Sequence, residues 1–352
     1  MRVFKYPILL IVSFLWVGGC SKTVMHLLYK TNVVANDYQY GDLYRLSNLP
    51  QFKDPVAPCP PKYVPLDSAR THLYVIGDSF TEPERLSKQD FPVSYFRRVK
   101  WDKQETIQLD STAHNILLIE SVERHFREHA ASSIQNLIVV NDTNRMNSPE
   151  RAYPSFGNQL IDLVHAEGIE ERLETILFSQ PIFLWFKELK ASLTLGGFNR
   201  VSPNVSLSQD RKHLLIALDT DATKLRNAGT SVLENEEVTG LVRTINEAST
   251  RYRSAGFDQV LLSIIPNKAT ILDTTLKPYN NLLERVQTHP ELNVPVANVL
   301  LPYQQIRNVY ALGDSHWNCT GRAIWIDAVT KQFRGEKANN SVRADKQKQP
   351  GY

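Results

Sequence analysis

The tripeptide Gly-Asp-Ser occurs twice in this sequence, at residues 77–79 and at residues 313–315, and His316 directly follows the second copy. Side chains two residues apart in extended backbone point to the same side, so Asp314 can accept a hydrogen bond from His316. A carboxylate placed there fixes the imidazole tautomer and leaves the other ring nitrogen free to take a proton from a serine. The two segments therefore predict nucleophilic catalysis, with Ser79 as nucleophile, His316 as general base and Asp314 as its orienting acid.

Each half of this pattern is weak when it is taken alone. A serine that follows a strand is often only a helix cap, and Asp-x-His arises easily by chance. In the first copy, Gly77 permits a tight turn from a strand into a helix, and the backbone N–H of Ser79 can help to stabilise an oxyanion. We expect Asp78 to be a turn residue in the first copy and Ser315 to be only a spacer in the second.

Apolar runs of strand length alternate with segments of helical periodicity along most of the chain. This alternation predicts an α/β fold, a three-layer sandwich with a mainly parallel sheet. Because reactive groups gather beyond the carboxyl ends of parallel strands, the two Gly-Asp-Ser segments can meet at one edge. The predicted strands cover residues 72–77, 105–109, 115–121, 135–140, 258–266 and 294–302. Helices are predicted at residues 122–130, 238–256, 279–289 and 321–335, with a helix start and a broken helical segment at 82–99.

The main domain is predicted to cover residues 71–335, with an insertion at about 150–235 that is harder to interpret. Within the insertion, residues 159–178 have helical spacing and residues 196–210 have the composition of a loop. The aromatic-rich segment 180–193 is either a core helix or an amphipathic surface element, and we expect it to lie in the core.

The first 20 residues have the pattern of an export signal. Residues 1–5 carry positive charge, and residues 6–17 are an apolar stretch too short for a comfortable membrane span. The ending Gly-Gly-Cys resembles a bacterial lipobox, in which Cys20 is lipidated and becomes the mature N-terminus. The alternative is an uncleaved membrane anchor. Both predict an extracytoplasmic, membrane-attached protein, such as one of the periplasm.

Residues 21–70 contain a cluster of prolines between polar residues, which favours an extended tether over packed structure. The tail at residues 336–352 is polar, and we expect it to be disordered. An oxidising compartment would allow Cys59 and Cys319 to form a disulfide, provided that the fold brings them together. The alternative is two unrelated free thiols.

The composition argues against several classes of function. The chain has 352 residues, a formal net charge of +3, 42% hydrophobic residues and 22% charged residues, as in an ordinary globular protein. A charge this small gives no reason to expect a nucleic-acid partner. The sequence has neither a His-Glu-x-x-His zinc motif nor a phosphate-binding glycine loop, so we expect no metal and no other cofactor.

Four segments together resemble the SGNH hydrolase superfamily, and most closely its acetyltransferase-like branch, typified by the alginate O-acetylation proteins. "IGDSF" is similar to the nucleophile block of that family, and "GDSHWNCTG" is similar to its Asp-x-His-Trp block. "NILLIESVERHF" and "SIIPNKATIL" are similar to two further segments of the family. The resemblance implies a flavodoxin-like three-layer sandwich and the same three catalytic residues, Ser79, His316 and Asp314.

The chain departs from the family in two respects. The serine block comes first, as in ordinary SGNH esterases and unlike the alginate proteins, and no Gly-x-Asn-Asp block is evident. Asn141 and Asn144 are therefore weak candidates for the oxyanion hole beyond the Ser79 amide, and a surface turn is the alternative for both. Arg124 and Lys268 are weak candidates for substrate contacts, and the alternatives are an ion-paired or solvated arginine and a loop charge.

The resemblance implies an extracytoplasmic serine O-acyltransferase that transfers an acyl group, acetyl in the favoured case, to a cell-surface or extracellular polysaccharide. Its implied partner is a membrane-bound O-acyltransferase. Two alternatives stay open: an SGNH esterase that deacetylates glycans, and a catalytically silent lipoprotein that binds a glycan. No residue in the sequence decides whether a sugar or water is the second nucleophile.

Overall fold

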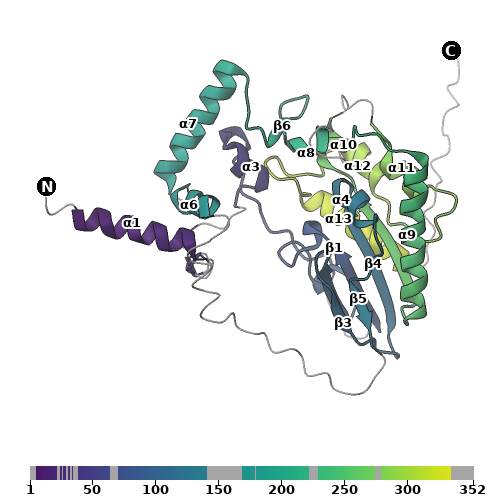
Figure 1. Ribbon diagram of the computed structural model, residues 1–352. Helices are drawn as coiled ribbons and strands as arrows, with labels where there is room; N and C mark the ends of the chain where they lie inside the picture. Colours follow the sequence, from purple (N-terminus) through teal and green to yellow (C-terminus); the bar gives the residue numbers. More distant parts are fainter. Residues whose placement is uncertain are drawn as a thin grey trace, which may run out of the picture.

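A parallel β-sheet lies at the centre of the computed structural model (Figure 1). Four strands form this sheet in the order β2-β1-β4-β8, and helices flank it in a three-layer α/β arrangement, which confirms the predicted fold class. The strands are β1 (Thr71–Gly77), β2 (Tyr95–Lys100), β4 (His114–Val122) and β8 (Gln259–Ile265). The structure describes residues 5–21, 39–63, 70–140, 169–178, 180–221, 229–273 and 279–333, with a few positions between 24 and 34.

The central strands are buried on both faces, as expected of a parallel sheet that helices cover. β4 pairs with β1 on one side and β8 on the other, and its residues 116–119 are completely buried. Flanking helices attach through polar contacts as well as apolar packing: the Trp325 indole N–H donates to Ser263 Oγ on β8 at 2.9 Å. The flanking helices are α4 (Glu123–His129), α9 (Asn235–Ser254) and α13 (Cys319–Phe333).

The parallel strands align their carboxyl ends at one edge of the sheet. β1 ends at Gly77, β4 at Val122 and β8 at Ile265. The loop of residues 311–316 reaches the same edge, because Lys268 beyond β8 donates hydrogen bonds to three of its carbonyls. Near this edge lie α10 (Lys268–Leu272), α11 (Leu282–Gln287) and α12 (Leu300–Ile306).

Two predicted elements are wrong. Residues 82–99 contain no regular α-helix but a short 3₁₀ turn and then β2, an edge strand. An edge strand needs no continuous apolar run, so its sequence gave no strand signal. Residues 294–302 form only a single bridge, at Val296, before α12 begins, because proline 295 cannot donate a ladder hydrogen bond.

The remaining strands lie outside the central sheet. β3 pairs with β5 in parallel, and β6 pairs with β7 as an antiparallel hairpin in part of the stretch expected to be a loop. The strands are β3 (Glu105–Ile107), β5 (Leu137–Val139), β6 (Val205–Leu207) and β7 (Leu214–Ile216), and α8 (Ala217–Thr220) follows them. The 3₁₀ turns are η1 (Pro50–Phe52), η2 (Ser79–Thr81) and η3 (Lys88–Asp90).

Besides the β6–β7 hairpin and α8, the described part of the insertion contains the helices α6 (Ile169–Phe178) and α7 (Pro181–Phe198). None of the residues of α7 is buried. The prediction that segment 180–193 lies in the core is therefore wrong, and the alternative of an amphipathic surface element fits the structure. Residues 150–168 of the insertion lie outside the described residues, as does the tail at 336–352.

The N-terminal helix α1 (Lys5–Cys20) covers most of the predicted export signal. Where the structure describes the chain, none of the helices combines the length and the apolar character needed to cross a membrane.

The predicted tether is wrong for residues 39–52, which pack against the domain, whereas residues 54–58 are exposed and without regular structure. The short helix α3 (Asp42–Ser47) buries Leu43 and Tyr44, and Phe52 follows them into the same apolar cluster. Gly41 has a φ of 93°, and a Cβ there would lie 2.5 Å from the carbonyl oxygen of Gly313. The apolar residues before the proline cluster find a partner surface that the local sequence does not reveal, while the prolines that the structure describes are themselves exposed.

A disulfide joins Cys59 of this segment to Cys319 at the start of α13, with a Cα–Cα distance of 5.3 Å. The bond closes a loop across a sequence separation of 260 residues. Closing so long a loop restricts the unfolded chain strongly.

We expect the double variant Cys59→Ser, Cys319→Ser to lose about 2–5 kcal/mol of unfolding free energy, measured by urea unfolding. A reducing agent should destabilise the wild-type protein by a similar amount and leave the double variant unchanged. Equal stability of the oxidised wild type and the variant would show that the bond contributes nothing.

Candidate active site

The first Gly-Asp-Ser forms a tight turn at the end of β1. A Cβ on Gly77 would lie 2.2 Å from Thr81 Oγ1 and 2.7 Å from Glu120 Oε2, so glycine is required by the close approach of these groups. The Asp78 carboxylate accepts hydrogen bonds from the backbone N–H of Phe80 and of Val122. Asp78 is thus the predicted turn residue, and it also ties the turn to the end of β4.

The three predicted catalytic residues meet at the carboxyl edge of the sheet. Ser79 Oγ lies 2.9 Å from His316 Nε2, and His316 Nδ1 lies 2.6 Å from Asp314 Oδ1. Asp314 Oδ1 also accepts the backbone N–H of His316 at 2.8 Å, which fixes the two residues of the loop relative to each other. Ser79 remains partly exposed, whereas His316 and Asp314 are buried. This is the arrangement in which an imidazole can deprotonate a serine.

The electrostatic surroundings keep Asp314 ionised. Burial alone raises the pKa of this carboxyl, but the hydrogen bond and charge of His316 together with the Arg85 guanidinium outweigh burial and hold the pKa below its usual range. Arg85 Nη2 lies 3.9 Å from Asp314 Oδ2. A carboxylate that stays negative can stabilise the imidazolium that forms when His316 takes the serine proton.

A second carboxylate, Asp42, belongs to the site and was missed in the sequence. Its Oδ1 accepts the backbone N–H of Ser315 at 2.7 Å, and its Oδ2 accepts the Ser315 hydroxyl at 2.6 Å. Asp42 Oδ2 also lies 3.8 Å from His316 Nδ1. Burial and the neighbouring charge of Asp314 raise the pKa of Asp42.

Ser315 is therefore more than the spacer that the sequence predicted, because it fastens the histidine loop to α3. The signal for Asp42 was the group of apolar residues that follows it, Leu43, Tyr44 and Leu49, which mark a packed segment. The carboxylate itself has no partner nearby in sequence, since 273 positions separate Asp42 from Ser315.

Lys268 is a structural anchor, and the prediction that it contacts substrate is wrong. Its side chain is 1% exposed, and Nζ donates to the carbonyl oxygens of Ala311, Leu312 and Asp314 at 2.5, 2.9 and 3.0 Å. Burial lowers the pKa of Lys268 to about 7, although nearby carboxylates act in the opposite direction. The Lys268 amine therefore holds the backbone of the histidine loop at residues 311–314, and Asp42 holds the same loop at Ser315.

The other weak candidates do not join the triad. Arg124 is buried, with Nη1 3.9 Å from Asp219 Oδ1, so it belongs to an interior ion pair and not to a substrate surface. Asn141 and Asn144 lie outside the described residues. Within the described chain, the backbone N–H of Ser79 donates to no acceptor, which leaves it available to an oxyanion as predicted.

One group among the described residues has the geometry to hold a metal ion: Asp42, Asp314 and His316 offer ligand atoms within 4.8 Å of one another. These atoms are already used by hydrogen bonds to Ser315 and between His316 and Asp314. Asp314 Oδ2 has no hydrogen-bond partner within the described residues, and its nearest cation is Arg85 Nη2 at 3.9 Å.

Comparison of the chain with protein-family models, with curated proteins and with solved structures finds no match. The interpretation of this site therefore depends on its geometry.

We expect Asp42→Ala to lower the unfolding free energy by about 1–3 kcal/mol, because the buried N–H and hydroxyl of Ser315 lose their acceptors. Asp42→Asn retains one acceptor oxygen and should lose less. Urea unfolding of both variants measures the difference. A fully stable Asp42→Ala variant would show that the link between α3 and the histidine loop does not stabilise the fold.

Lys268 makes stability depend on pH. Its pKa falls from 10.5 to about 7 on folding, so between these values the unfolded chain binds more protons, and unfolding free energy rises with pH. We expect Lys268→Met to reduce this slope by up to about 1.4 kcal/mol per pH unit between about pH 7 and pH 10. Urea unfolding across this range measures it.

The matched control is Lys331→Met, which removes an exposed lysine from α13 and should leave the slope unchanged. An identical slope in wild type and Lys268→Met would mean that Lys268 keeps the same proton affinity in both states.

Proposed function

We propose that this protein is a serine-dependent O-acyltransferase that transfers an acyl group, acetyl in the favoured case, to a polysaccharide hydroxyl. The observation that carries the proposal is the continuous chain of hydrogen bonds from Ser79 through His316 to Asp314. A partly exposed serine hydroxyl on a buried, carboxylate-oriented histidine supports acyl chemistry. The resemblance of both motifs to the SGNH acetyltransferase-like branch supports the choice of acyl group and acceptor.

In the proposed first step, Ser79 Oγ attacks the carbonyl carbon of the donor ester while His316 Nε2 takes the hydroxyl proton. The tetrahedral oxyanion is stabilised by the free backbone N–H of Ser79. When the carbon–oxygen bond of the donor breaks, His316 gives its proton to the leaving alkoxide and Ser79 carries the acyl group. In the second step a sugar hydroxyl passes its proton to His316 and attacks the acyl-serine, and Ser79 recovers its proton.

The same triad supports an esterase, in which water takes the place of the sugar hydroxyl. The partial exposure of Ser79 is the observation that favours this second candidate, because water can reach the acyl-serine. A catalytically silent glycan-binding lipoprotein is the third candidate, and it would make no use of the hydrogen-bonded serine.

We further propose that the protein acts outside the cytoplasm and is attached to the membrane by its N-terminal segment, through lipid on Cys20 or through a retained apolar helix. The disulfide between Cys59 and Cys319 supports an oxidising compartment. A membrane-bound O-acyltransferase that supplies the acyl group is the proposed partner.

We expect Ser79→Ala and His316→Ala to lose about 10³-fold or more in hydrolysis of p-nitrophenyl acetate, because each removes a member of the triad. The control Ser132→Ala changes an exposed serine and should keep full activity. Mass spectrometry of the wild type should find an acetyl group on Ser79.

Adding a polysaccharide acceptor separates the two enzymatic candidates. An acetylated glycan as product supports the transferase, whereas free acetate alone supports the esterase. Undiminished activity in Ser79→Ala would overturn both.

A further inference from the structure

Helix α7 carries apolar side chains on two faces: Leu184, Ala191 and Leu195 pack against the apolar cluster around Phe52, and a second stripe faces outward. A surface helix of a soluble protein directs its apolar stripe to the core and its charged residues to water. In α7 the outward stripe at spacing i, i+4, i+7 and i+11 is Ile182, Phe186, Leu189 and Leu193, and all four side chains are exposed. Phe183, Trp185 and Phe198 are exposed as well.

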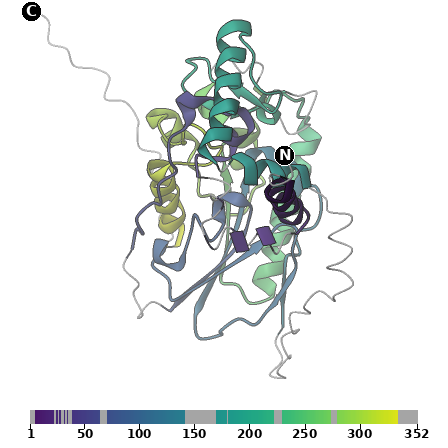
Figure 2. The same cartoon turned by 90° about the vertical axis from the view of Figure 1, so that its left-hand side faces the viewer.

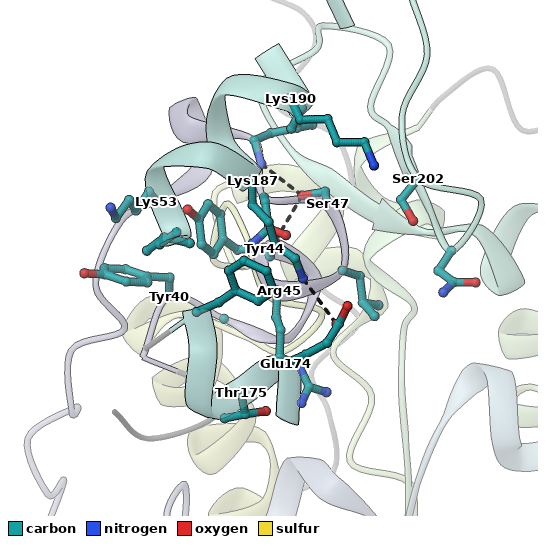
Figure 3. Close-up of a pocket in the computed structure, with 18 of the residues that line it drawn as sticks. Tyr40, Tyr44, Arg45, Ser47, Lys53, Glu174, Thr175, Lys187, Lys190 and Ser202 are labelled. Atoms are coloured by element: carbon teal, nitrogen blue, oxygen red, sulfur yellow. Dashed lines mark hydrogen bonds and ion pairs between the residues drawn. The ribbon is translucent and has the colours of Figure 1, made fainter. Parts of the chain in front are cut away.

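Two charged residues of α7, Lys187 and Glu188, face inward, and the exposed Lys190 also borders the cavity. Lys187 Nζ lies 3.2 Å from Glu174 Oε2 on α6, and Glu188 Oε1 lies 2.9 Å from Lys53 Nζ. Tyr44 of α3 donates its hydroxyl proton to the same Glu188 carboxylate. This inner face borders a cavity of about 1020 Å³ between α3, α6 and α7, into which Lys187 and Glu174 point (Figure 3).

A second helix with exposed apolar side chains, α1, is connected to α7 through α6. α1 is exposed along most of its described side chains, among them Leu10 and Trp16. Its C-terminal end packs on α6, where the Arg172 side chain donates to the carbonyl of Gly19 at 2.6 Å. α6 in turn packs against α7, so the three helices form one continuous layer, called here the α1–α6–α7 layer.

The orientation of α1 and α7 fits a flat lipid bilayer. Both lie on one side of the molecule, opposite α9 (Figure 1). When that side faces the viewer, α1 is seen nearly end-on and α7 lies across the face (Figure 2). A flat bilayer placed on this side would receive α1 along its normal and α7 in its interface.

The side chains of α7 suit the lipid interface. Aromatic residues such as Trp185 and Phe186 favour the level of the headgroups, and leucines reach the acyl boundary. Lys190 is exposed beside the stripe, and a cation there attracts anionic headgroups. A second copy of this chain would cover the stripe equally well in area, but the proposed N-terminal membrane attachment on the same side of the molecule favours a bilayer.

From these observations we propose that α7 is an interfacial membrane-binding helix, which lies in the surface of an anionic lipid bilayer beside the point where the N-terminal segment enters it. The proposal adds a second contact to the proposed N-terminal attachment and is independent of the acyl-transfer chemistry. Where residues 1–19 are kept, the chain meets the bilayer next to α6, because Gly19 packs there.

The fold gives this contact a consequence for the site. α3 borders the cavity under α7 through Tyr44 and holds the histidine loop through Asp42. A bilayer on α7 would therefore fix the height and orientation of the triad above the lipid surface.

The test uses the full chain with a fluorophore that responds to polarity on a single introduced cysteine. Leu193→Cys places it on the outward stripe, and Glu247→Cys places it on an exposed position of α9. Both carry Cys20→Ser, which leaves the introduced thiol as the labelling site. Vesicles of phosphatidylethanolamine and phosphatidylglycerol, with or without a lipid-borne nitroxide quencher, are then added.

We expect the label at position 193 to shift to shorter wavelength and to be quenched by the nitroxide lipid, while the label at position 247 does neither. Vesicle flotation measures whether the protein binds. If it binds but the label at position 193 does not respond, the proposal is overturned in favour of attachment by α1 alone. Failure to bind vesicles would overturn it too. A shift without vesicles that grows with protein concentration would identify a second copy as the occupant.

A matched pair of leucines provides the second measurement. Leu193 is 62% exposed on α7, and Leu301 is 60% exposed on α12, outside the α1–α6–α7 layer. Leu193→Ser should lower the vesicle partition coefficient about tenfold, because one apolar side chain no longer enters lipid, and Leu301→Ser should leave it unchanged. Equal effects would overturn the proposal. Hydrolysis of soluble p-nitrophenyl acetate should be the same in both variants, so this test can fail without affecting the proposed function.

Discussion

The position of residues 311–316 depends on the buried amine of Lys268, and the rest of the site depends on that loop. Three backbone carbonyls converge on one Nζ atom, which satisfies them where water has little access. Because these hydrogen bonds fix the backbone before and after Gly313, they fix where Asp314 and His316 project. The turn that carries Ser79 follows β1 at the carboxyl edge of the sheet, and this position is enough to bring Ser79 to the His316 imidazole.

Close backbone packing completes this constraint. Gly41 and Gly313 approach so closely that a Cβ on either would meet backbone atoms of the other segment or its neighbours. That contact brings Asp42 into reach of Ser315, and the disulfide at Cys59 holds the same segment against α13 farther along. The segment is thus fastened at both ends, and its first part, with Gly41 and Asp42, becomes one wall of the site.

Buried carboxylates in this protein differ in how far their surroundings compensate for the loss of water. Asp314 stays ionised beside His316 and Arg85, whereas burial raises the pKa of Asp219 to about 7 despite the nearby Arg124. Where a nearby charge or hydrogen-bonding group balances the loss of water, as at Asp314, the carboxylate stays ionised, and where it does not, as at Asp219, the pKa rises. On the outside, α7 keeps its ion pairs toward the cavity and presents apolar side chains outward.

The sequence by itself determined the parts of this protein whose physics is local. Apolar runs identified β1, β4 and β8, and the spacing of Asp314 and His316 identified a histidine with an orienting acid, because both patterns are set within a few residues. Tertiary structure decided whatever depends on distant partners. Asp42 acquires its role from Ser315, and β2 is held as an edge strand by β1 without an apolar run of its own. The direction in which α7 turns its apolar stripe was also undecidable locally, because helical periodicity defines a stripe but not the surface that the stripe faces.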